Sequence, residues 1–253
     1  MKLRDKVCII TGGAMGIGAA VAATFRKEGA YVFICDMNRE AGEALAKELA
    51  PQPAEAGGAE FAFLDISKEA NWQQVMDTIR GSRGRLDVLV NNAGINIRKD
   101  IEDMPEADLD TMLSVNVKGP FMGIKHALPL MRNSGGGSIL NMVSICGLVG
   151  HKFTNETYTM CKGALTLLTK SIASRYAKDN IRCNSIHPST VDTPGLQKVL
   201  TDPVLREQRY GEIPLGRLAT SEDVAQAFLY LASEEASFLN GVNLPVDGGL
   251  TAY

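Results

Sequence analysis

Short runs of consecutive hydrophobic residues alternate with helical patterns along almost the whole chain. The runs have the length of β-strands and lie at residues 6–11, 31–35, 60–64, 86–90, 138–142, 181–186 and 241–246. Strands that are hydrophobic throughout are typical of a parallel sheet that helices cover on both faces. The pattern therefore predicts an α/β protein with a doubly wound, Rossmann-type parallel sheet.

The segments between these runs have helical periodicity. In residues 17–28, Ile17, Val21 and Phe25 recur every four residues, which places them on one buried stripe of a helix. No internal repeat, linker or second zone of composition interrupts the alternation. Residues 1–253 are therefore predicted to form a single domain.

The composition excludes several classes of protein. The 253 residues are 45% hydrophobic and 22% charged, with a net charge of -3, as in an ordinary soluble protein. The chain lacks the basic clusters of nucleic-acid-binding proteins, an apolar stretch of membrane-spanning length and a signal-peptide pattern. The five scattered cysteines indicate free thiols, and no His/Cys/Asp cluster has metal-ligand spacing. We therefore expect a cytoplasmic protein with no metal, nucleic-acid or membrane partner.

The octet TGGAMGIG, residues 11–18, connects the first predicted strand to the first predicted helix. Glycine lets the backbone turn tightly and approach a pyrophosphate, and the helix N-terminus offers unpaired N–H groups and the positive end of the helix dipole. A tight turn without a ligand is the alternative. The position between strand and helix favours dinucleotide binding.

Asp36 ends the second predicted strand, where a carboxylate can accept hydrogen bonds from a ribose hydroxyl. The same carboxylate would repel the 2′-phosphate of NADP by roughly 1–4 kcal/mol at about 4 Å. NAD is therefore the predicted cofactor. A helix-capping Asp is the alternative, and the nearby Arg39 keeps NADP open.

Further motifs follow the later strands. Asp65 and Ile66 close the third strand, where a polar and an apolar side chain could hold an adenine ring. The motif NNAG, residues 91–94, ends the fourth strand, and HPSTVDT, residues 187–193, ends the sixth. The carboxyl ends of parallel strands share one edge of the sheet, where ligands bind. We expect these motifs to line one groove.

The stretch YTMCK places Tyr158 and Lys162 four positions apart, on one face of a helix. A free tyrosine has a pKa of about 10, so its anion needs stabilisation before it can take a proton from an alcohol, and Lys162 could supply it. Lys162 could also reach the nicotinamide ribose. Ser144, after the fifth strand, could hold the substrate oxygen, and Asn116 could hold a water or backbone link for the proton. A capping serine and a buried, satisfied asparagine are the alternatives.

Taken together, Thr11-Gly-x-x-x-Gly-x-Gly18, Asn91-Asn-Ala-Gly94, Asn116, Ser144 and Tyr158-x-x-x-Lys162 resemble the ordered motifs of the short-chain dehydrogenase/reductase family. The resemblance covers nearly the whole chain and implies a seven-stranded sheet in the order 3-2-1-4-5-6-7 and a homotetramer. It implies that the catalytic residues are Asn116, Ser144, Tyr158 and Lys162. It implies contacts to NAD from Gly12, Met15, Gly16, Ile17, Gly18, Asp36, Asp65, Ile66, Asn92, Ala93, Gly94, Tyr158, Lys162, Pro188, Val191 and Thr193.

One position departs from the family pattern, which usually has Pro-Gly after the sixth strand. Here the pair is Pro188-Ser189. Ser189 restricts the backbone and could contact nicotinamide or substrate. The contacts inferred for Thr190, Val191 and Thr193 therefore depend on this loop.

Several residues near these motifs need an interpretation of their own. His187 is predicted to be a structural loop residue, and His126 a surface or interface residue. Residues 147–157 should rim the substrate pocket, which makes His151, Phe153 and Asn155 candidates for substrate contact. Cys146 and Cys161 flank the chemistry and are predicted to be small buried residues, although their oxidation could inhibit the enzyme.

The predicted function is NAD-dependent hydride transfer between nicotinamide and a secondary alcohol or ketone, with Tyr158 as acid/base. The segments ITGGAMGIG, CDMN and VDGGLTAY are similar to dehydrogenases of cyclic or aryl-alkyl alcohols, and we expect a substrate of cyclic, aryl-alkyl or hydroxy-acid type. Sugars, diols and steroids remain open. Residues 192–215 are expected to form a mobile substrate lid. A 3-oxoacyl thioester reductase, which normally uses NADPH, and a catalytically idle NAD-binding regulatory protein are the alternatives.

Overall fold

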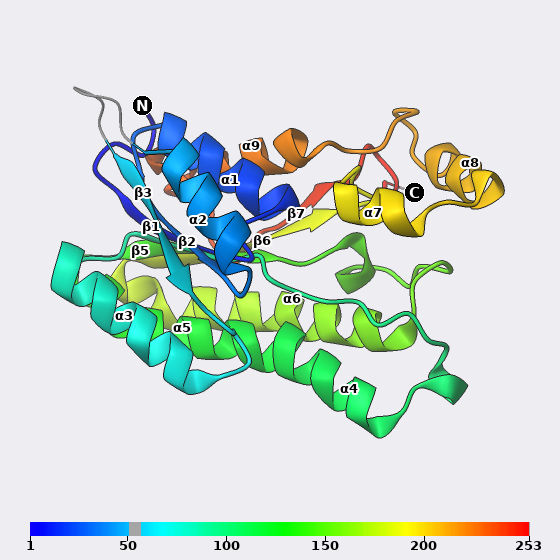
Figure 1. The fold of residues 1–253 in the computed structure, drawn as a ribbon, viewed down its shortest axis with the longest axis horizontal. Helices are drawn as coiled ribbons and strands as arrows, with labels where there is room; N and C mark the ends of the chain where they lie inside the picture. Colours follow the sequence, from blue (N-terminus) through cyan, green and yellow to red (C-terminus); the bar gives the residue numbers. More distant parts are fainter. Residues whose placement is uncertain (51–56, 253) are drawn as a thin grey trace.

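The computed structural model describes residues 1–50 and 57–252. Within them, parallel strands form one 7-stranded sheet in the order β3-β2-β1-β4-β5-β6-β7, which confirms the predicted single-domain fold (Figure 1). The strands are β1 (Val7–Thr11), β2 (Tyr31–Asp36), β3 (Gly58–Phe63), β4 (Val88–Asn91), β5 (Gly137–Met142), β6 (Ile181–Pro188) and β7 (Asn243–Val246).

Helices cover both faces of the sheet (Figure 1). One face carries α1 (Gly16–Lys27), α2 (Arg39–Glu48) and α9 (Ser221–Ala232), and the other carries α3 (Glu69–Arg83), α5 (Gly119–Asn133) and α6 (Glu156–Tyr176). Because side chains alternate along a strand, Ile10 packs into the core with Phe228, while its neighbour Ile9 packs into the opposite core with Trp72. This double burial explains the continuous hydrophobic runs.

The sixth strand is longer than the sequence predicts. The hydrophobic run ends at residue 186, whereas β6 continues to Pro188. The reason is the edge strand β7, whose Pro245 and Val246 pair with His187 and Pro188. This pairing carries the end of β6 to the edge of the sheet where the glycine turn lies.

The segment between β4 and α5 contains an irregular helix. Here α4 (Glu106–Leu113) continues into a π-helical turn (Ser114–Lys118) before α5 begins. Such π-turns inside helices are frequent at functional sites. Asn116 lies in this turn and is buried.

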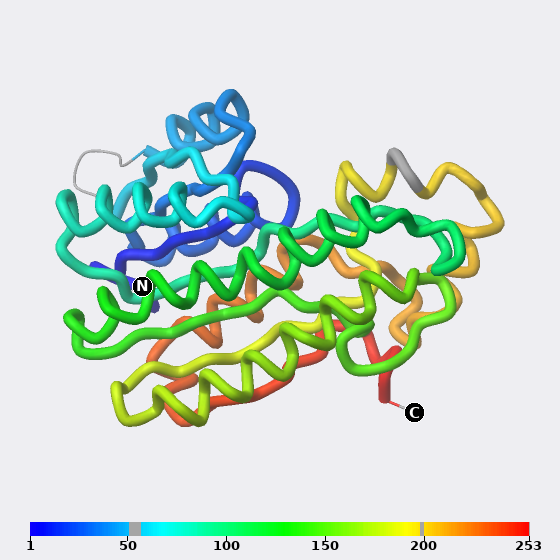
Figure 2. Tube along the Cα trace, turned by 90° about the horizontal axis from the view of Figure 1, so that it is seen from below, coloured from blue at the N-terminus to red at the C-terminus, as the bar shows by residue number. Residues whose placement is uncertain are grey.

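Residues 194–211 form two short helices, α7 (Pro194–Val199) and α8 (Pro203–Gly211), in the segment where the sequence predicts a lid. Figure 2 shows them at one end of the molecule, beyond the carboxyl ends of the strands. Each begins with a proline after a capping side chain, Thr193 for α7 and Asp202 for α8. In the described part of the chain, no helix is long and apolar enough to cross a membrane.

Candidate active site

The glycine turn after β1 packs directly against the loop after β4. Gly12 has φ +60, and a Cβ atom there would come within 2.9 Å of the Ala93 Cα atom, so a larger residue would push the two loops apart. Met15 precedes α1 and makes no side-chain capping bond, which leaves the first-turn N–H groups of this helix for a ligand. The turn therefore fits the phosphates of a dinucleotide.

Asp36 stands beside this turn at the end of β2. Its carboxylate accepts hydrogen bonds from the backbone N–H groups of Ala14 at 3.1 Å and Asn38 at 2.9 Å. These bonds fix the carboxylate against the glycine turn, although Asp36 stays partly exposed. The side chain thus has the position expected for a ribose-binding carboxylate.

Asn92 and Thr11 join the two loops. The Asn92 side-chain amide donates to the carbonyls of Thr11 and Gly12, at 2.9 and 3.1 Å. The Thr11 hydroxyl oxygen accepts from the backbone N–H groups of Asn92 and Ala93, both at 3.0 Å. Both amide protons of Asn92 are committed to these bonds, so Asn92 holds the groove together instead of presenting its N–H groups to a ligand.

The expectation that Asp65 and Ile66 close β3 is wrong, while their contact with an adenine ring stays a prediction. The strand ends at Phe63, and the Asp65 carboxylate accepts from the N–H and hydroxyl of Ser67, at 2.9 and 2.7 Å. The Ile66 side chain is only 6% exposed and packs against Gly119 of α5. Ile66 is therefore part of the core beneath the groove, because the close approach of α5 at a glycine covers it.

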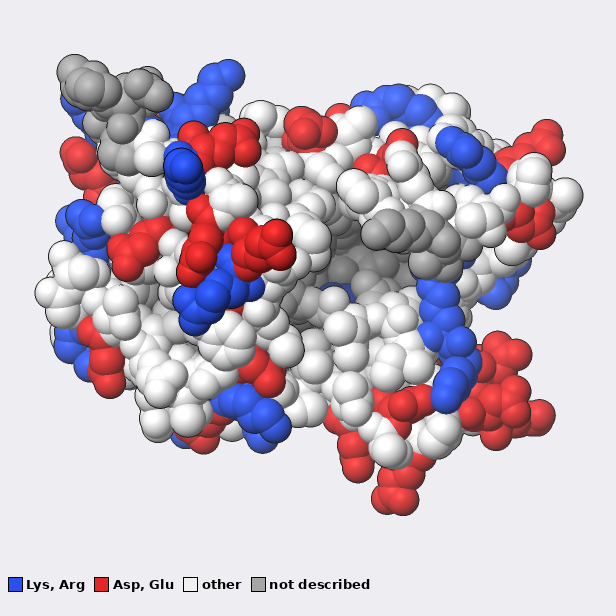
Figure 3. Space-filling view, viewed as in Figure 1, with Lys and Arg blue, Asp and Glu red and all other residues white. Residues whose placement is uncertain are grey.

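A cavity of about 460 Å³ opens beyond the glycine turn, within the roughly 300–1,000 Å³ typical of small-molecule sites. Its described lining comes from Ile17, from Asn96 and Arg98 after β4, and from the segments 144–158 and 189–209. In the space-filling view a hollow separates the α7 region from the α4–α6 layer (Figure 3). Tyr158 and Ser144 both line this cavity.

Tyr158 and Lys162 lie one turn apart on α6, as their spacing predicts. The Lys162 Nζ atom is 5.4 Å from the centroid of the Tyr158 ring and donates to the Met142 carbonyl at 2.9 Å. Lys162 is only 3% exposed, and no ion pair joins it to a carboxylate within the residues described. Its ammonium is therefore aimed between the end of β5 and the tyrosine ring.

Burial shifts the pKa values of both groups toward their neutral forms. Burial lowers the pKa of Lys162 to about 8, and it raises the pKa of Tyr158 above its usual value. The positive charge of Arg98 acts in the opposite direction on Tyr158 and lowers its pKa. The phenolate form of Tyr158 thus depends on nearby positive charge.

Ser144 is held from two sides. Its hydroxyl oxygen accepts from the Cys146 N–H at 3.2 Å, and its carbonyl accepts from Nδ1–H of His187 at 2.8 Å. The contact with a carbonyl places the ring proton on Nδ1, and Nε2 then accepts from the Ser185 hydroxyl at 2.8 Å. Burial lowers the pKa of His187 to about 4, which keeps the ring neutral. His187 is fully buried and positions Ser144, which is a structural role, but it lies in β6 and not in a loop as predicted.

Asn116 fixes the loop after β4. Its side chain accepts from the Ile95 N–H at 3.0 Å and donates to the Ile95 carbonyl at 2.9 Å. A Cβ atom at Gly94 would come within 2.8 Å of the Asn116 Oδ1 atom, so the glycine permits this close approach. The sequence predicts that Asn116 holds either a water molecule or a backbone group, and the structure shows bonds to the backbone of Ile95.

The segment before α6 contains three residues predicted to contact substrate, and two of them lie at the cavity. His151 and Phe153 line the cavity. Asn155 is not part of the described lining, and its side chain caps α6, so its contact with substrate stays a prediction. It accepts from the Tyr158 N–H at 2.8 Å and donates to Asn96 Oδ1 at 2.8 Å. The reason is its position immediately before the helix.

The loop after β6 lines the same cavity through Ser189, Thr190, Val191 and Thr193. The Ser189 Oγ atom is buried and has no hydrogen-bond partner among the described residues. The Thr193 hydroxyl caps α7 by accepting from the Leu196 N–H at 3.2 Å. The serine that departs from the family pattern therefore leaves a polar atom at the cavity wall.

Sequence reasoning missed two arginines of the cavity, Arg98 and Arg209. Arg98 follows the NNAG motif, and loops after strand ends are where ligands bind, so its place in the chain was an available signal. Arg209 lies on α8, and no pattern in the sequence indicates that this helix folds back onto residues 151–153. The five cysteines are all free thiols, as predicted, and all five are buried, as predicted for Cys146 and Cys161.

The chain resembles known proteins over its whole length. A family model described as enoyl-(acyl carrier protein) reductase matches residues 12–251. The chain is 41% identical over 251 residues to a cyclopentanol dehydrogenase of Comamonas testosteroni, with 99% of each protein covered. It is 38% identical over 254 residues to a trans-4-hydroxycyclohexanecarboxylate dehydrogenase of Sinomonas cyclohexanicum, with 99% of this chain and 95% of the relative covered.

A third relative is an NADP-dependent (R)-specific alcohol dehydrogenase of Lentilactobacillus kefiri. It is 38% identical over 257 residues, with 99% of this chain and 98% of the relative covered. The residues matched by the family model, 12–251, include the motifs from the glycine turn to Lys162. The chain therefore belongs to the short-chain dehydrogenase/reductase family of oxidoreductases.

Proposed function

We propose that this protein is an NAD-dependent dehydrogenase that transfers a hydride between nicotinamide and a secondary alcohol or its ketone. The observation that carries the proposal is that Tyr158 and Ser144 line one cavity, with the buried Lys162 one turn from Tyr158 on α6. The glycine turn and Asp36 stand at the same edge of the sheet, where a dinucleotide would be held.

Each side chain then has one role. NAD supplies the hydride acceptor when it is bound. Tyr158 takes the hydroxyl proton of the alcohol, and the Ser144 hydroxyl holds the substrate oxygen. The Lys162 ammonium favours the phenolate of Tyr158 by its charge. Asn116 is a positioning residue that acts through its two bonds to Ile95.

The cofactor specificity is proposed from Asp36. Its carboxylate is fixed by two backbone N–H groups, so it could not turn away from a 2′-phosphate without losing both bonds. The candidate cation for NADP, Arg39, is already paired with Glu43 at 3.0 Å and lies over the ring of Phe61. Both observations favour NAD, although one relative uses NADP.

The substrate class is proposed from the cavity wall and the relatives. Ile145, Leu196, Leu200 and Leu205 give the cavity an apolar side, which suits a saturated ring. Two relatives are named for cyclic alcohols, cyclopentanol and trans-4-hydroxycyclohexanecarboxylate. We therefore favour cyclic secondary alcohols over open-chain ones.

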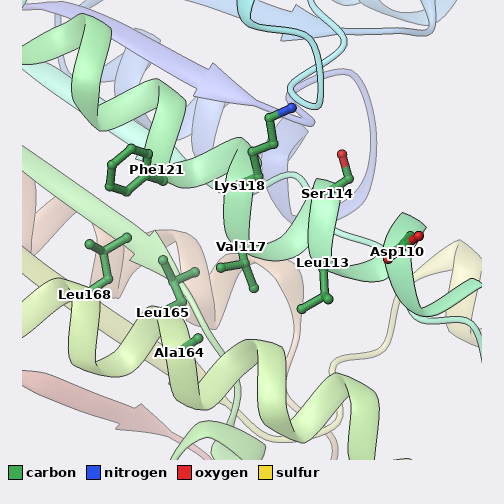
Figure 4. Close-up of a pocket in the computed structure, with 9 residues that line it drawn as sticks. All are labelled: Asp110, Leu113, Ser114, Val117, Lys118, Phe121, Ala164, Leu165 and Leu168. Carbon is green, nitrogen blue, oxygen red and sulfur yellow. The ribbon is translucent and has the colours of Figure 1, made fainter. Parts of the chain in front are cut away.

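We also propose that the enzyme is a cytoplasmic homotetramer. An apolar groove of about 680 Å³ runs along α4, the π-turn, α5 and α6, and its walls include Val117, Phe121 and Leu165 (Figure 4). Phe121 is 50% exposed, and such contiguous apolar surfaces are uncommon on monomers. A second copy that presents the same face would cover this groove, and the fully exposed Phe238 offers a second contact surface. Light scattering of Phe121→Asp should then report a smaller particle than the wild type.

Two alternatives remain distinct from this proposal. A 3-oxoacyl thioester reductase would normally use NADPH, which the fixed Asp36 carboxylate disfavours. A catalytically idle NAD-binding protein would not require Tyr158 and Ser144 at one cavity with Lys162 beside the tyrosine ring.

The test is reduction of NAD⁺ and of NADP⁺ at about pH 9 over a panel of cyclic and open-chain secondary alcohols, with the Tyr158→Phe variant alongside. We expect NAD-dependent turnover of cyclic alcohols, lost in Tyr158→Phe. Activity with NADP⁺ alone would contradict the role of Asp36. Tight NADH binding without turnover of any alcohol or ketone would support the idle protein.

A further inference from the structure

The cavity that contains Tyr158 and Ser144 has a positive wall. Arg98 and Arg209 both line it, and none of its described lining residues is Asp or Glu. The chain as a whole has a net charge of -3, so the two arginines at this wall do not reflect a general excess of basic residues. Blue Lys and Arg side chains are visible at the rim of the hollow in Figure 3.

Arg209 is already occupied by protein partners. Its guanidinium donates to the Phe153 carbonyl at 3.0 Å, lies 4.6 Å from the centroid of the Phe153 ring and stands 3.6 Å from the Glu212 carboxylate. Glu212 also approaches His151 Nε2 at 3.3 Å. Arg209 therefore holds α8 against the segment before α6, and its charge is largely compensated.

Arg98 differs from Arg209 in having no such partners. Among the described residues, no hydrogen bond, ion pair or aromatic ring contact engages its guanidinium. The neighbouring Lys99, in contrast, is paired with Asp108 at 2.6 Å. Asp100 follows closely in the chain but is not among the residues that line the cavity. A free guanidinium at the wall of an active-site cavity presents a fork of N–H donors that matches a carboxylate.

We propose that Arg98 binds a carboxylate of the substrate, so that the preferred substrates are cyclic secondary alcohols that also carry a carboxylate group. The inference rests on the proposed dehydrogenase function and narrows its substrate class. The apolar wall formed by Leu196, Leu200 and Leu205 would contact the ring. Tyr158 and Ser144 would take the hydroxyl end, and Arg98 the acid end. The carboxylate itself is unchanged in the reaction, since only the carbinol hydride and the hydroxyl proton are transferred.

The experiment compares trans-4-hydroxycyclohexanecarboxylate with its uncharged carboxamide in the full-length enzyme. With saturating NAD⁺, kcat/KM for the acid should exceed that for the amide by about two- to fivefold, as expected for an ion pair at an exposed arginine. Arg98→Gln should abolish this preference, mainly by raising KM for the acid, while Arg98→Lys should retain part of it. Lys99→Gln, which removes a neighbouring paired cation, should leave the ratio of acid to amide unchanged.

A binding measurement separates this inference from the proposed function. In the presence of NADH, cyclohexanecarboxylate should raise the melting temperature of the wild type and of Lys99→Gln, but not of Arg98→Gln, and cyclohexanecarboxamide should raise none. If this pattern is found without turnover of any alcohol, the anion site stands and the dehydrogenase proposal fails. A ratio of acid to amide near one in the wild type, or one that Arg98→Gln leaves unchanged, would overturn the role of Arg98. Comparison of melting curves without ligand verifies that each variant is folded.

Discussion

Lys162 should make the cofactor-free protein less stable than a protein with an apolar residue at this position. Its ammonium is 3% exposed, and burial lowers its pKa from 10.5 to about 8. At about 1.4 kcal/mol per pK unit, this shift costs the folded state about 3.5 kcal/mol at pH 7. The hydrogen bond from Nζ to the Met142 carbonyl returns about 1 kcal/mol. Lys162→Met should therefore stabilise the protein by about 2.5 kcal/mol at pH 7 while it lowers the maximal rate of turnover.

The pH dependence gives a sharper form of this prediction. Because the folded-state pKa is lowered, the unfolded chain binds more protons between about pH 8 and 10.5, and the stability of the wild type rises with pH across that window. Lys162→Met has no such group. The variant's excess in free energy of unfolding over the wild type should therefore be full below about pH 8. It should fall by about 2.5 kcal/mol between pH 7 and pH 10.

Thermal melts at pH 7 and pH 10 measure both effects. For a chain of this length, about 2.5 kcal/mol corresponds to a rise in Tm of roughly 5–10 °C at pH 7. Lys170→Met is the matched control, because Lys170 also lies on α6 and donates to a backbone carbonyl, that of Gly241 at 3.2 Å, but is exposed. Lys170→Met should show neither the rise in stability at pH 7 nor the dependence of that rise on pH. A Lys162→Met variant that is less stable than the wild type at pH 7 would refute the reasoning.

Three further predictions follow from single contacts. Asp36→Ser should raise the ratio of kcat/KM for NADP⁺ to that for NAD⁺ by about tenfold or more, because it removes like-charge repulsion. It should also weaken the binding of both cofactors, because the Ala14 N–H loses its acceptor. An unchanged ratio would exclude Asp36 as the residue that selects NAD. Asn155→Ala should cost about 1 kcal/mol in urea unfolding through the lost cap of α6, whereas Asn155→Asp should cost less. The rate of alcohol oxidation should rise from pH 6 toward the alkaline side, because burial raises the pKa of Tyr158, and a flat profile with chemistry rate-limiting would contradict the acid/base role.

The fold could be predicted from the sequence because its signals are local. Continuous hydrophobic runs such as β1 report burial on both faces, and the order of runs and helices then limits the topology. The pair Tyr158 and Lys162 could be placed by helical spacing alone. The end of β6 could not, because its last two residues are strand only through their pairing with the edge strand β7.

The parts of the site that sequence reasoning missed depend on contacts between distant segments. Asn155 looks like a rim residue from its neighbours, and only the start of α6 shows that its side chain is used as a cap. Ile66 lies beneath α5 because Gly119 allows the helix to approach, which no spacing within residues 60–66 indicates. The difference between the two arginines also depends on distant contacts. Phe153 and Glu212 bind Arg209 but not Arg98.

The shifts at Tyr158 and Lys162 together constrain how the proton can move. Burial favours the neutral form of each, so a phenolate with a neutral lysine would leave a buried negative charge without its principal partner. A phenolate with a charged Lys162 is the combination in which the two charges compensate, and it raises the pKa of Lys162 while it lowers that of Tyr158. Deprotonation of Tyr158 and retention of the Lys162 proton are therefore coupled. Glutamine or methionine in place of Lys162 should then move the alkaline limb of the pH–rate profile upward, beyond lowering the maximal rate.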